Sequence, residues 1–255
     1  MEPSSFLSVR LLAHRRGEYG FDEQRWPFLL GLISVIFLLM GCVSVSLFAF
    51  PLLGVLCFFL SLVHLLTASS YVYTTRRGKF LVWAEILLGL DLCGDEQILD
   101  LGCGRGAVLF MAANLLPRGK ATGIDIWRTK EQSRNALSST WQNANLEGVD
   151  ERVTLQTADM QRLPFSEGSF DLVLSSLAIH NIRDPEGYER AINEAVRVLK
   201  AGGRLVIADI RETRRYAQHL QALGMEDVSH HRLDWRFWYG TPWTATRLVK
   251  ARKAA

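Results

Sequence analysis

The stretch that decides the fold is Ile98-Leu-Asp-Leu-Gly-Cys-Gly-Arg-Gly106. Three of its first four residues are apolar, which is typical of a strand buried on both faces. Gly102, Gly104 and Gly106 follow at alternating positions, and an apolar pattern with helical spacing begins at Ala107. A strand, a glycine turn and a helix start form the first crossover of nucleotide-binding α/β folds, where glycine lets the backbone approach a ligand. The stretch therefore predicts a nucleotide-binding α/β domain.

The spacing of these glycines, G-x-G-x-G, differs from the G-x-G-x-x-G fingerprint of dinucleotide-binding proteins. With the acidic residue that precedes it, the turn resembles the first motif of the class I S-adenosylmethionine-dependent methyltransferases. The resemblance implies that the turn binds the methyl donor, S-adenosylmethionine (SAM), through Asp100, Gly102, Cys103, Gly104 and Gly106. The same spacing argues against a nucleotide-dependent oxidoreductase, the main rival enzyme class.

A second acidic residue lies where such folds bind ribose. Asp125 ends a predicted strand over residues 121–126 and follows Gly106 by 19 residues. In nucleotide-binding α/β folds, a carboxylate at this place accepts hydrogen bonds from ribose hydroxyls. A carboxylate at a strand end can also cap the helix that follows it. The spacing to the glycines favours the ribose role, and the capping role stays open as the alternative.

Motifs further along the chain strengthen the same resemblance. It implies that Ile126 flanks the adenine, and that Asp159 and Met160, in an Ala-Asp-Met triplet, bind its amino edge. The run over 163–173, L-P-F-x-x-x-S-F-D-x-V, is typical of the family and leads into a fourth strand. Ser175 lies at the end of that strand, where a donor-binding residue is expected.

His180 is the candidate catalytic residue. It follows the fourth strand, and ligands of open α/β sheets bind at the carboxyl ends of strands. Methyl transfer from a sulfonium mainly requires proximity and orientation, and a general base is needed only when the acceptor must lose a proton. An imidazole, which titrates near pH ~6.5, suits that role. The sequence leaves open whether His180 is this base or only lines the acceptor pocket.

The resemblance covers residues 78–255 and implies a Rossmann-like α/β fold: a seven-stranded, mostly parallel sheet with helices on both faces. Glycine turns and apolar patterns set the expected elements along this part of the chain. The strands are expected over 98–101, 121–126, 153–159, a segment ending at 176, 200–209, 226–237 and 244–250, and the helices over 78–90, 107–116, 133–145, 184–199 and 212–222.

A long uncharged run precedes this domain. Residues 27–73 contain no Asp, Glu, Lys or Arg, and about 20 helical residues suffice to cross a bilayer core, so the run is long enough for two spans. Proline removes a helical donor, so Phe50-Pro51 is the natural break between helices near 27–49 and 52–73. The sequence therefore predicts a transmembrane helical hairpin over 26–75, between a cytoplasmic segment over 1–25 and a methyltransferase domain over 76–255.

The flanking charges predict an orientation. Basic residues precede and follow the hairpin, whereas the turn between its helices is uncharged. By the positive-inside rule, both termini and the catalytic domain are cytoplasmic, in an inner or plasma membrane. Small residues in the hairpin leave room for close helix contacts and for a homo-oligomer. The flanking basic residues are Arg15, Arg16, Arg25, Arg76, Arg77 and Lys79.

Three further stretches allow two interpretations each. Residues 6–13 form either a short amphipathic helix on a membrane surface or a partly ordered leader. His64, inside the apolar run, is either a functional site or a neutral imidazole bonded across the hairpin. The aromatic stretch over 235–239, together with Pro242 and Trp243, either forms an apolar lid or rests on the membrane, or it is ordinary strand packing.

Composition excludes several other classes. The net charge of +3, without a basic patch interleaved with aromatic residues, gives no reason to expect a nucleic acid partner. The four cysteines have neither metal-ligand spacing nor the pattern of a disulfide framework, so no metal is expected. The prediction is a membrane-anchored enzyme that transfers a methyl group from SAM to a small lipophilic or lipid acceptor. The alternative is a non-catalytic membrane protein whose Rossmann-like domain binds a ligand or serves as a scaffold.

Overall fold

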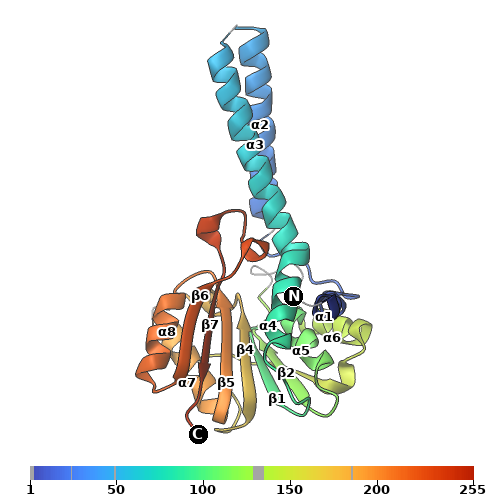
Figure 1. Cartoon of the computed structure of the whole chain (residues 1–255), viewed down its shortest axis with the longest axis vertical. Coiled ribbons are helices and arrows are strands. Elements are labelled where there is room, and N and C mark those ends of the chain that lie inside the picture. The colour runs from blue at the N-terminus through green and yellow to red at the C-terminus, as the bar shows by residue number, and fades with distance from the viewer. Residues whose placement is uncertain (1–2, 24, 49, 129–134, 185) are drawn as a thin grey trace.

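A mixed sheet forms the centre of the computed structural model, which describes residues 3–23, 25–48, 50–128, 135–184 and 186–255 (Figure 1). Its seven strands lie in the order β3-β2-β1-β4-β5-β7-β6. β7 pairs antiparallel with both of its neighbours, and the other pairs are parallel, which confirms the predicted sheet. The strands are β1 (Gln97–Leu101), β2 (Lys120–Asp125), β3 (Val153–Thr157), β4 (Phe170–Ser176), β5 (Leu199–Asp209), β6 (Glu226–Arg232) and β7 (Arg247–Arg252).

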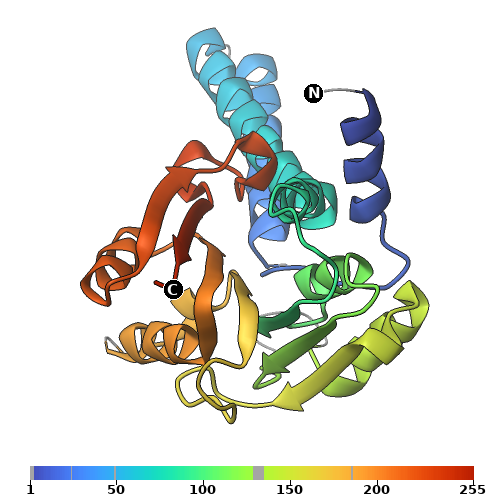
Figure 2. The ribbon, with the colours of Figure 1, turned by 60° about the horizontal axis from the view of Figure 1, so that its bottom comes forward.

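Helices cover both faces of the sheet, as Figure 2 shows. One hydrophobic core joins the sheet to α1 (Pro3–Ala13), α4 (Lys79–Leu88), α5 (Ala107–Asn114) and α6 (Leu137–Glu147). A second core joins the opposite face to α7 (Gly187–Val198) and α8 (Thr213–Ala222). α7 illustrates the reason: Ala191, Ile192 and Ala195 recur at helical spacing and are fully buried.

All strands of the sheet except β7 point their carboxyl ends toward the hairpin. The chain ends just beyond β7, at the edge of the sheet far from the hairpin (Figure 1). β5 runs antiparallel to β7, so the carboxyl ends of β5 and of the strands parallel to it lie at the opposite edge. Ligands of open α/β sheets bind at carboxyl ends, so this topology turns any such site toward the base of the hairpin.

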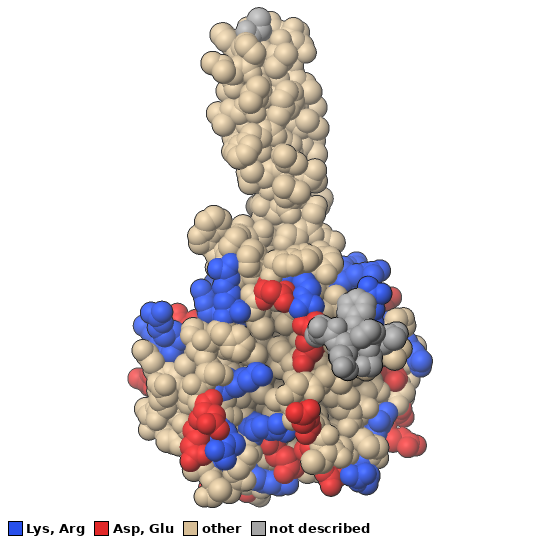
Figure 3. Space-filling model, in the orientation of Figure 1, with Lys and Arg blue, Asp and Glu red and all other residues tan. Residues whose placement is uncertain are grey.

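Two long apolar helices form that hairpin. α2 (Arg25–Ser46) and α3 (Pro51–Tyr73) are each long and apolar enough to cross a membrane. α3 begins at Pro51, as predicted, because a first-turn proline loses no helical hydrogen bond. A π-helical turn (Thr74–Gly78) then carries α3 directly into α4. The hairpin rises clear of the domain, and charged side chains begin only at its base (Figures 1 and 3).

Polar contacts hold the two helices together. The hydroxyl of Ser34 donates to the carbonyl of Ser61 at 2.9 Å, and the hydroxyl of Ser61 donates to the carbonyl of Ser34 at the same distance. Among the described residues, His64 makes no hydrogen bond across the hairpin, which contradicts one of its two interpretations. Its Nδ1 lies 2.7 Å from the carbonyl of Leu60, one turn earlier in its own helix, and its ring contacts Phe37 of α2.

The N-terminal segment is part of the domain. Residues 6–13 are helical, but Val9 and Leu12 are buried in the core beside α4 and are not available to a membrane surface. The backbone amide of Glu18 donates to Asn143 Oδ1 at 2.9 Å, and Asn143 Nδ2 donates back to the carbonyl of Glu18 at 2.9 Å. Two reciprocal hydrogen bonds therefore tie this segment to α6.

The aromatic stretch over 235–239 does not continue β6, so the predicted strand over 226–237 is too long and ordinary strand packing does not describe this stretch. β6 ends at Arg232 rather than at 237, and a 3₁₀ turn (Trp235–Phe237) follows. Its residues pack on the base of α3: the Trp235 ring stacks on Tyr73 at a centroid distance of 5.2 Å, and Tyr239 contacts Tyr71 edge-on at 5.1 Å. The predicted helix over 133–145 is also shifted, because α6 begins at Leu137; residues 133–134 lie outside the described residues.

Candidate active site

The glycine turn links β1 to its neighbours at their carboxyl ends. The backbone amides of Gly102 and Cys103 both donate to the carbonyl of Ile124, at 2.9 and 3.0 Å. Gly102 adopts a φ of +69°, and a Cβ there would overlap the Cβ of Ala178. Two features therefore require glycine at this position: the left-handed backbone conformation and the close approach of the chain after β4.

Asp125 closes the turn from the end of β2. Its Oδ2 accepts a hydrogen bond from the backbone amide of Gly104 at 2.9 Å, and its Oδ1 accepts one from the backbone amide of Trp127 at 2.5 Å and one from Asn135 Nδ2 at 3.3 Å. The sequence left open whether this carboxylate caps or binds ribose; it orders the turn here, and its two oxygens have about four acceptor positions. Three of these positions are used by the protein, so about one remains for a ribose hydroxyl.

Asp100 is a buried acid with an unused acceptor. It is 1% exposed, and its Oδ1 has no hydrogen-bond partner among the described residues. Burial, together with the nearby charge of Asp125, raises the pKa of Asp100 to about 8. A buried polar atom without a partner is costly, which marks a place where a ligand with donors would be stabilised.

The residues predicted to contact adenine lie at and just beyond the ends of β2 and β3. The backbone amide of Ala158 donates to the carbonyl of Asp125 at 3.3 Å and ties the two strand ends together. Ile126 is 42% exposed, and Asp159 is exposed with its Oδ1 bonded to the amide of Gln161. Met160 reaches the turn itself, since its Cε lies 3.2 Å from where a Cβ on Gly102 would be.

Two predicted donor-binding residues face the protein interior. Ser175 is fully buried, and its hydroxyl donates to the carbonyl of Leu101 at 3.1 Å, so it holds β4 against β1 and presents no surface to a ligand. The Cys103 thiol is 7% exposed and lies 2.8 Å from the place of a Cβ on Gly123. Burial raises the pKa of that thiol. Cys103 thus contributes backbone to the turn and a side chain to the core.

His180 is paired with an acid that the sequence analysis did not single out. Its Nδ1 lies 2.5 Å from Oδ1 of Asp209, and its backbone amide donates to Oδ2 of the same carboxylate at 3.1 Å. Asp209 is fully buried, whereas the His180 side chain keeps 14% exposure. A carboxylate accepts and does not donate, so Nδ1 donates this hydrogen bond, and in the neutral ring Nε2 is then an acceptor. β4 and β5 are adjacent parallel strands, so their carboxyl ends lie side by side. This relationship could have been used to predict from the sequence that His180 and Asp209 lie close together.

The hairpin base borders this part of the site. Trp83 of α4 is 1% exposed and its indole Nε1 donates to Ser176 Oγ at 2.8 Å, at the end of β4. Next to it, Asp22 Oδ2 accepts hydrogen bonds from Lys79 Nζ at 2.6 Å and from the Tyr239 hydroxyl at 3.0 Å. Burial raises the pKa of Tyr239 well above its ordinary value. One ion-paired cluster thus joins the N-terminal segment, α4 and the C-terminal loop.

Comparison with known proteins agrees with this geometry. A family model described as a methyltransferase domain matches residues 94–244. The methyltransferase GfsG of Streptomyces halstedii is 33% identical over 121 residues, which are 48% of this chain and 40% of that protein. The sterol 4-C-methyltransferase strm-1 of Caenorhabditis elegans is 30% identical over 127 residues, 50% of this chain and 35% of that protein. The matched region thus spans less than half the length of these relatives.

Solved structures share the fold at low identity. The [4+2]-cyclase SpnF superposes with a TM-score of 0.55 and 21% identity, over 68% of this chain and 82% of that one. A geranyl diphosphate methyltransferase in complex with SAM superposes with a TM-score of 0.56 and 15% identity, over 68% of this chain and 84% of that one. Because the family model covers more than half of the sequence, the chain belongs to the SAM-dependent methyltransferase family.

Proposed function

We propose that this protein transfers a methyl group from SAM to a small lipophilic or lipid acceptor at a membrane surface. The observation that carries the proposal is the direction of the sheet: the glycine turn and the His180–Asp209 pair both lie at its carboxyl edge, beside the base of an apolar hairpin. A site in that position is reached most directly by an acceptor that is itself dissolved in the membrane.

The residues around the glycine turn fit the donor. SAM presents hydrogen-bond donors on its ribose, its amino group and its adenine, and the site offers Asp125, Asp100 and Asp159 as carboxylate acceptors. Gly102 leaves the space that a Cβ would fill. When bound, SAM supplies a sulfonium-activated methyl group. Holding the donor and the acceptor in line is then the main contribution of the protein.

His180 acts on the acceptor in this proposal. With Nδ1–H held by Asp209, Nε2 can take a proton from an alcohol or a similar acceptor as the new bond forms. The fully buried carboxylate of Asp209 fixes the tautomer and orientation of the ring, the part that an acid plays in catalytic triads. For an acceptor that loses no proton, the same pair shapes the pocket and His180 is a positioning residue.

We also propose that α2 and α3 cross a membrane. Their outer faces are apolar and exposed, with Phe28 at 76% and Leu52 at 87%, and few of their residues are buried within the protein. Arg25 lies at the start of α2 and Arg76 and Arg77 follow α3, so basic residues stand at one end of the hairpin only. By the positive-inside rule the catalytic domain and both termini are cytoplasmic, in an inner or plasma membrane. Pairing of two copies through the hairpin remains a prediction.

A lipophilic acceptor has support from one relative. The curated relative from C. elegans carries a sterol in its name, and a sterol is a molecule of the bilayer. The decisive experiment incubates the full-length protein, in neutral detergent, with methyl-labelled SAM and fractionated membrane lipids. Label is expected in an organic-soluble fraction. Label found only in water-soluble acceptors would contradict the proposal.

The second candidate function is ligand binding without catalysis, or catalysis of a reaction other than methyl transfer. Its support is that the fold alone does not imply methyl transfer, since one structural neighbour is a [4+2]-cyclase. Titration calorimetry with SAM and S-adenosylhomocysteine separates the candidates. Binding of both with no transfer to any lipid, thiol or phenol acceptor would favour the second candidate. Binding followed by transfer favours the first.

A further inference from the structure

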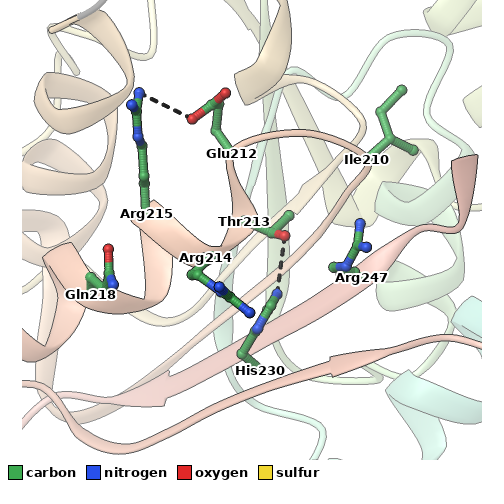
Figure 4. Close-up of a pocket in the computed structure, with 8 residues that line it drawn as sticks. All are labelled: Ile210, Glu212, Thr213, Arg214, Arg215, Gln218, His230 and Arg247. Carbon is green, nitrogen blue, oxygen red and sulfur yellow. Dashed lines mark hydrogen bonds and ion pairs between the residues drawn. The ribbon is translucent and has the colours of Figure 1, made fainter. Parts of the chain in front are cut away.

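A basic cleft opens next to the candidate active site, where α8 starts and the outer two strands of the sheet end. It encloses about 460 Å³, and Figure 4 shows its lining side chains. Arg214 and Arg215 come from α8, His230 from β6 and Arg247 from β7. The remaining lining residues are Ile210, Glu212, Thr213 and Gln218.

The charges in this cleft are not balanced by the protein. Glu212 pairs with Arg215 at 3.2 Å and neutralises it. Among the described residues, neither Arg214 nor Arg247 has an ion-pair partner. Burial, followed by the guanidinium groups of Arg247 and Arg214, lowers the pKa of His230.

Several side chains of the cleft are placed so that they can contact one bound group together. His230 Nε2 lies 3.0 Å from Thr213 Oγ1, which fixes the ring between β6 and the first turn of α8. Two uncompensated guanidinium groups on opposite walls can each offer a forked pair of N–H donors, the geometry that matches a phosphate group. Among the described residues, no carboxylate pairs with either of these two guanidinium groups.

Its position relates it to the membrane and to the reaction. Arg247 is the strand partner of Asp209, so the cleft lies one strand beyond the His180–Asp209 pair, at the same edge of the sheet. Trp243, 85% exposed in the loop before β7, stands at that edge with its ring in solvent. An anionic group held here would therefore lie near the bilayer surface if the hairpin spans the membrane.

We propose that this cleft binds a phosphate group, carried by the head group of an anionic lipid or by a soluble phosphate compound. Arg214 and Arg247 are its main ligands, and His230 adds a hydrogen bond from β6. The site does not depend on SAM binding or on methyl transfer. A failure of the proposed enzymatic function would leave it untouched.

The test uses the full-length protein in a neutral maltoside detergent and titration calorimetry with two probes. One is inorganic phosphate, and the other is dioleoyl phosphatidic acid in mixed micelles, with phosphatidylcholine as the blank. The Arg214→Gln/Arg247→Gln variant is compared with Arg118→Gln/Arg152→Gln, which removes the same charge from exposed positions at other places on the domain. Equal melting temperatures and equal S-adenosylhomocysteine binding establish that the variants are folded.

The wild-type protein is expected to bind at least one probe, and the cleft variant at least about tenfold more weakly, since each charge-assisted contact contributes about that factor. The control variant should match wild type within about twofold, because screening weakens distant charges. Phosphatidic acid bound more than about tenfold tighter than phosphate identifies a lipid head group; similar affinities identify a soluble compound.

Two results would overturn the proposal: no binding of either probe, or equal losses in the cleft and control variants. The single variant Arg214→Gln provides a second binding measurement, because Arg214 is exposed on α8 and its replacement leaves the sheet intact. It should weaken binding by an intermediate factor. An unchanged affinity in this variant would remove Arg214 from the site and the proposal with it.

Discussion

Asp209 Oδ1 lies 2.5 Å from His180 Nδ1, across the carboxyl ends of the adjacent parallel strands β4 and β5. The carboxylate is fully buried and also accepts the backbone amides of His180 and Ile210, so it cannot rotate away without losing three hydrogen bonds. The imidazole is thereby held in one tautomer and one orientation at the edge of the sheet where ligands bind.

Replacing His180 tests its role in the reaction. With an acceptor that loses a proton, His180→Gln should lower kcat by roughly 10²-fold or more, the usual contribution of a general base, and Asp209→Asn should act in the same direction. Donor affinity should stay within about twofold, because neither side chain belongs to the glycine turn. Methylation kinetics and SAM titration measure the two effects.

The control for this experiment is His219→Gln on α8, whose imidazole bonds at the surface, among the described residues, to Asn193 alone. It should retain full turnover. If His180→Gln changes KM and leaves kcat intact, His180 shapes the acceptor pocket and is not the base.

Asp100 should make donor binding depend on pH. Its pKa of about 8 lies above neutrality because the acid is buried, and a bound cation such as SAM would favour its ionised form. At pH 7, SAM binding should therefore release a proton, and affinity should rise as the pH approaches 8. Calorimetry in two buffers of different ionisation enthalpy measures the release, which Asp100→Asn should abolish.

The same group links stability to pH in the donor-free protein. The pKa of Asp100 is higher in the folded chain (about 8) than its ordinary value of 3.8, so the folded state binds more protons between these values. The contribution of Asp100 to stability is thus full below about pH 4 and is lost as the pH rises toward 8. Denaturation of wild type and Asp100→Asn at pH 5 and pH 8 should reveal a smaller loss in the variant. Parallel curves would mean that the acid is not protonated in the folded state.

Gly102 and Gly148 form a matched pair. Both adopt a φ of +69°, but a Cβ at Gly102 would overlap Ala178, whereas a Cβ at Gly148 would meet nothing within 4 Å. Gly148→Ala should lower the free energy of unfolding by about 1 kcal/mol, the cost of a left-handed alanine. Gly102→Ala should cost more and should also weaken SAM binding, because the turn must shift. Equal thermal shifts, with normal SAM binding in both, would contradict the steric role of Gly102.

The hairpin and the N-terminal segment should prove separable. Replacing residues 27–70 by a short flexible linker keeps Val9, Leu12 and Tyr19 in the domain core and should preserve SAM binding while abolishing membrane flotation. Deleting residues 1–78 removes those core side chains as well as the bonds between Glu18 and Asn143, so that shorter chain should aggregate or melt at a lower temperature. A deleted chain as stable as the linker variant would show that the segment does not support the domain.

The sequence by itself determined the local parts of this protein. The strand, glycine turn and helix start over 97–114 follow from contiguous residues, as does the break at Pro51, because proline and glycine act on their own backbone. The order of these motifs also indicated the parallel sheet, since each crossover repeats the same local pattern. The spacing between the glycines and Asp125 was therefore enough to predict that they lie together, which the hydrogen bond from Gly104 to Asp125 confirms.

Tertiary structure decided what depends on contacts between distant segments. The partner of His180 is 29 residues away, and the bond between Glu18 and Asn143 spans 125 residues. Helical and strand periodicity in a sequence cannot predict contacts over such separations. Ser175 was assigned to the donor from its place at a strand end, yet its hydroxyl points into the sheet, because alternate side chains of a strand face opposite sides. The basic cleft likewise joins arginines of α8 and β7, which lie together only because β7 returns antiparallel beside β5.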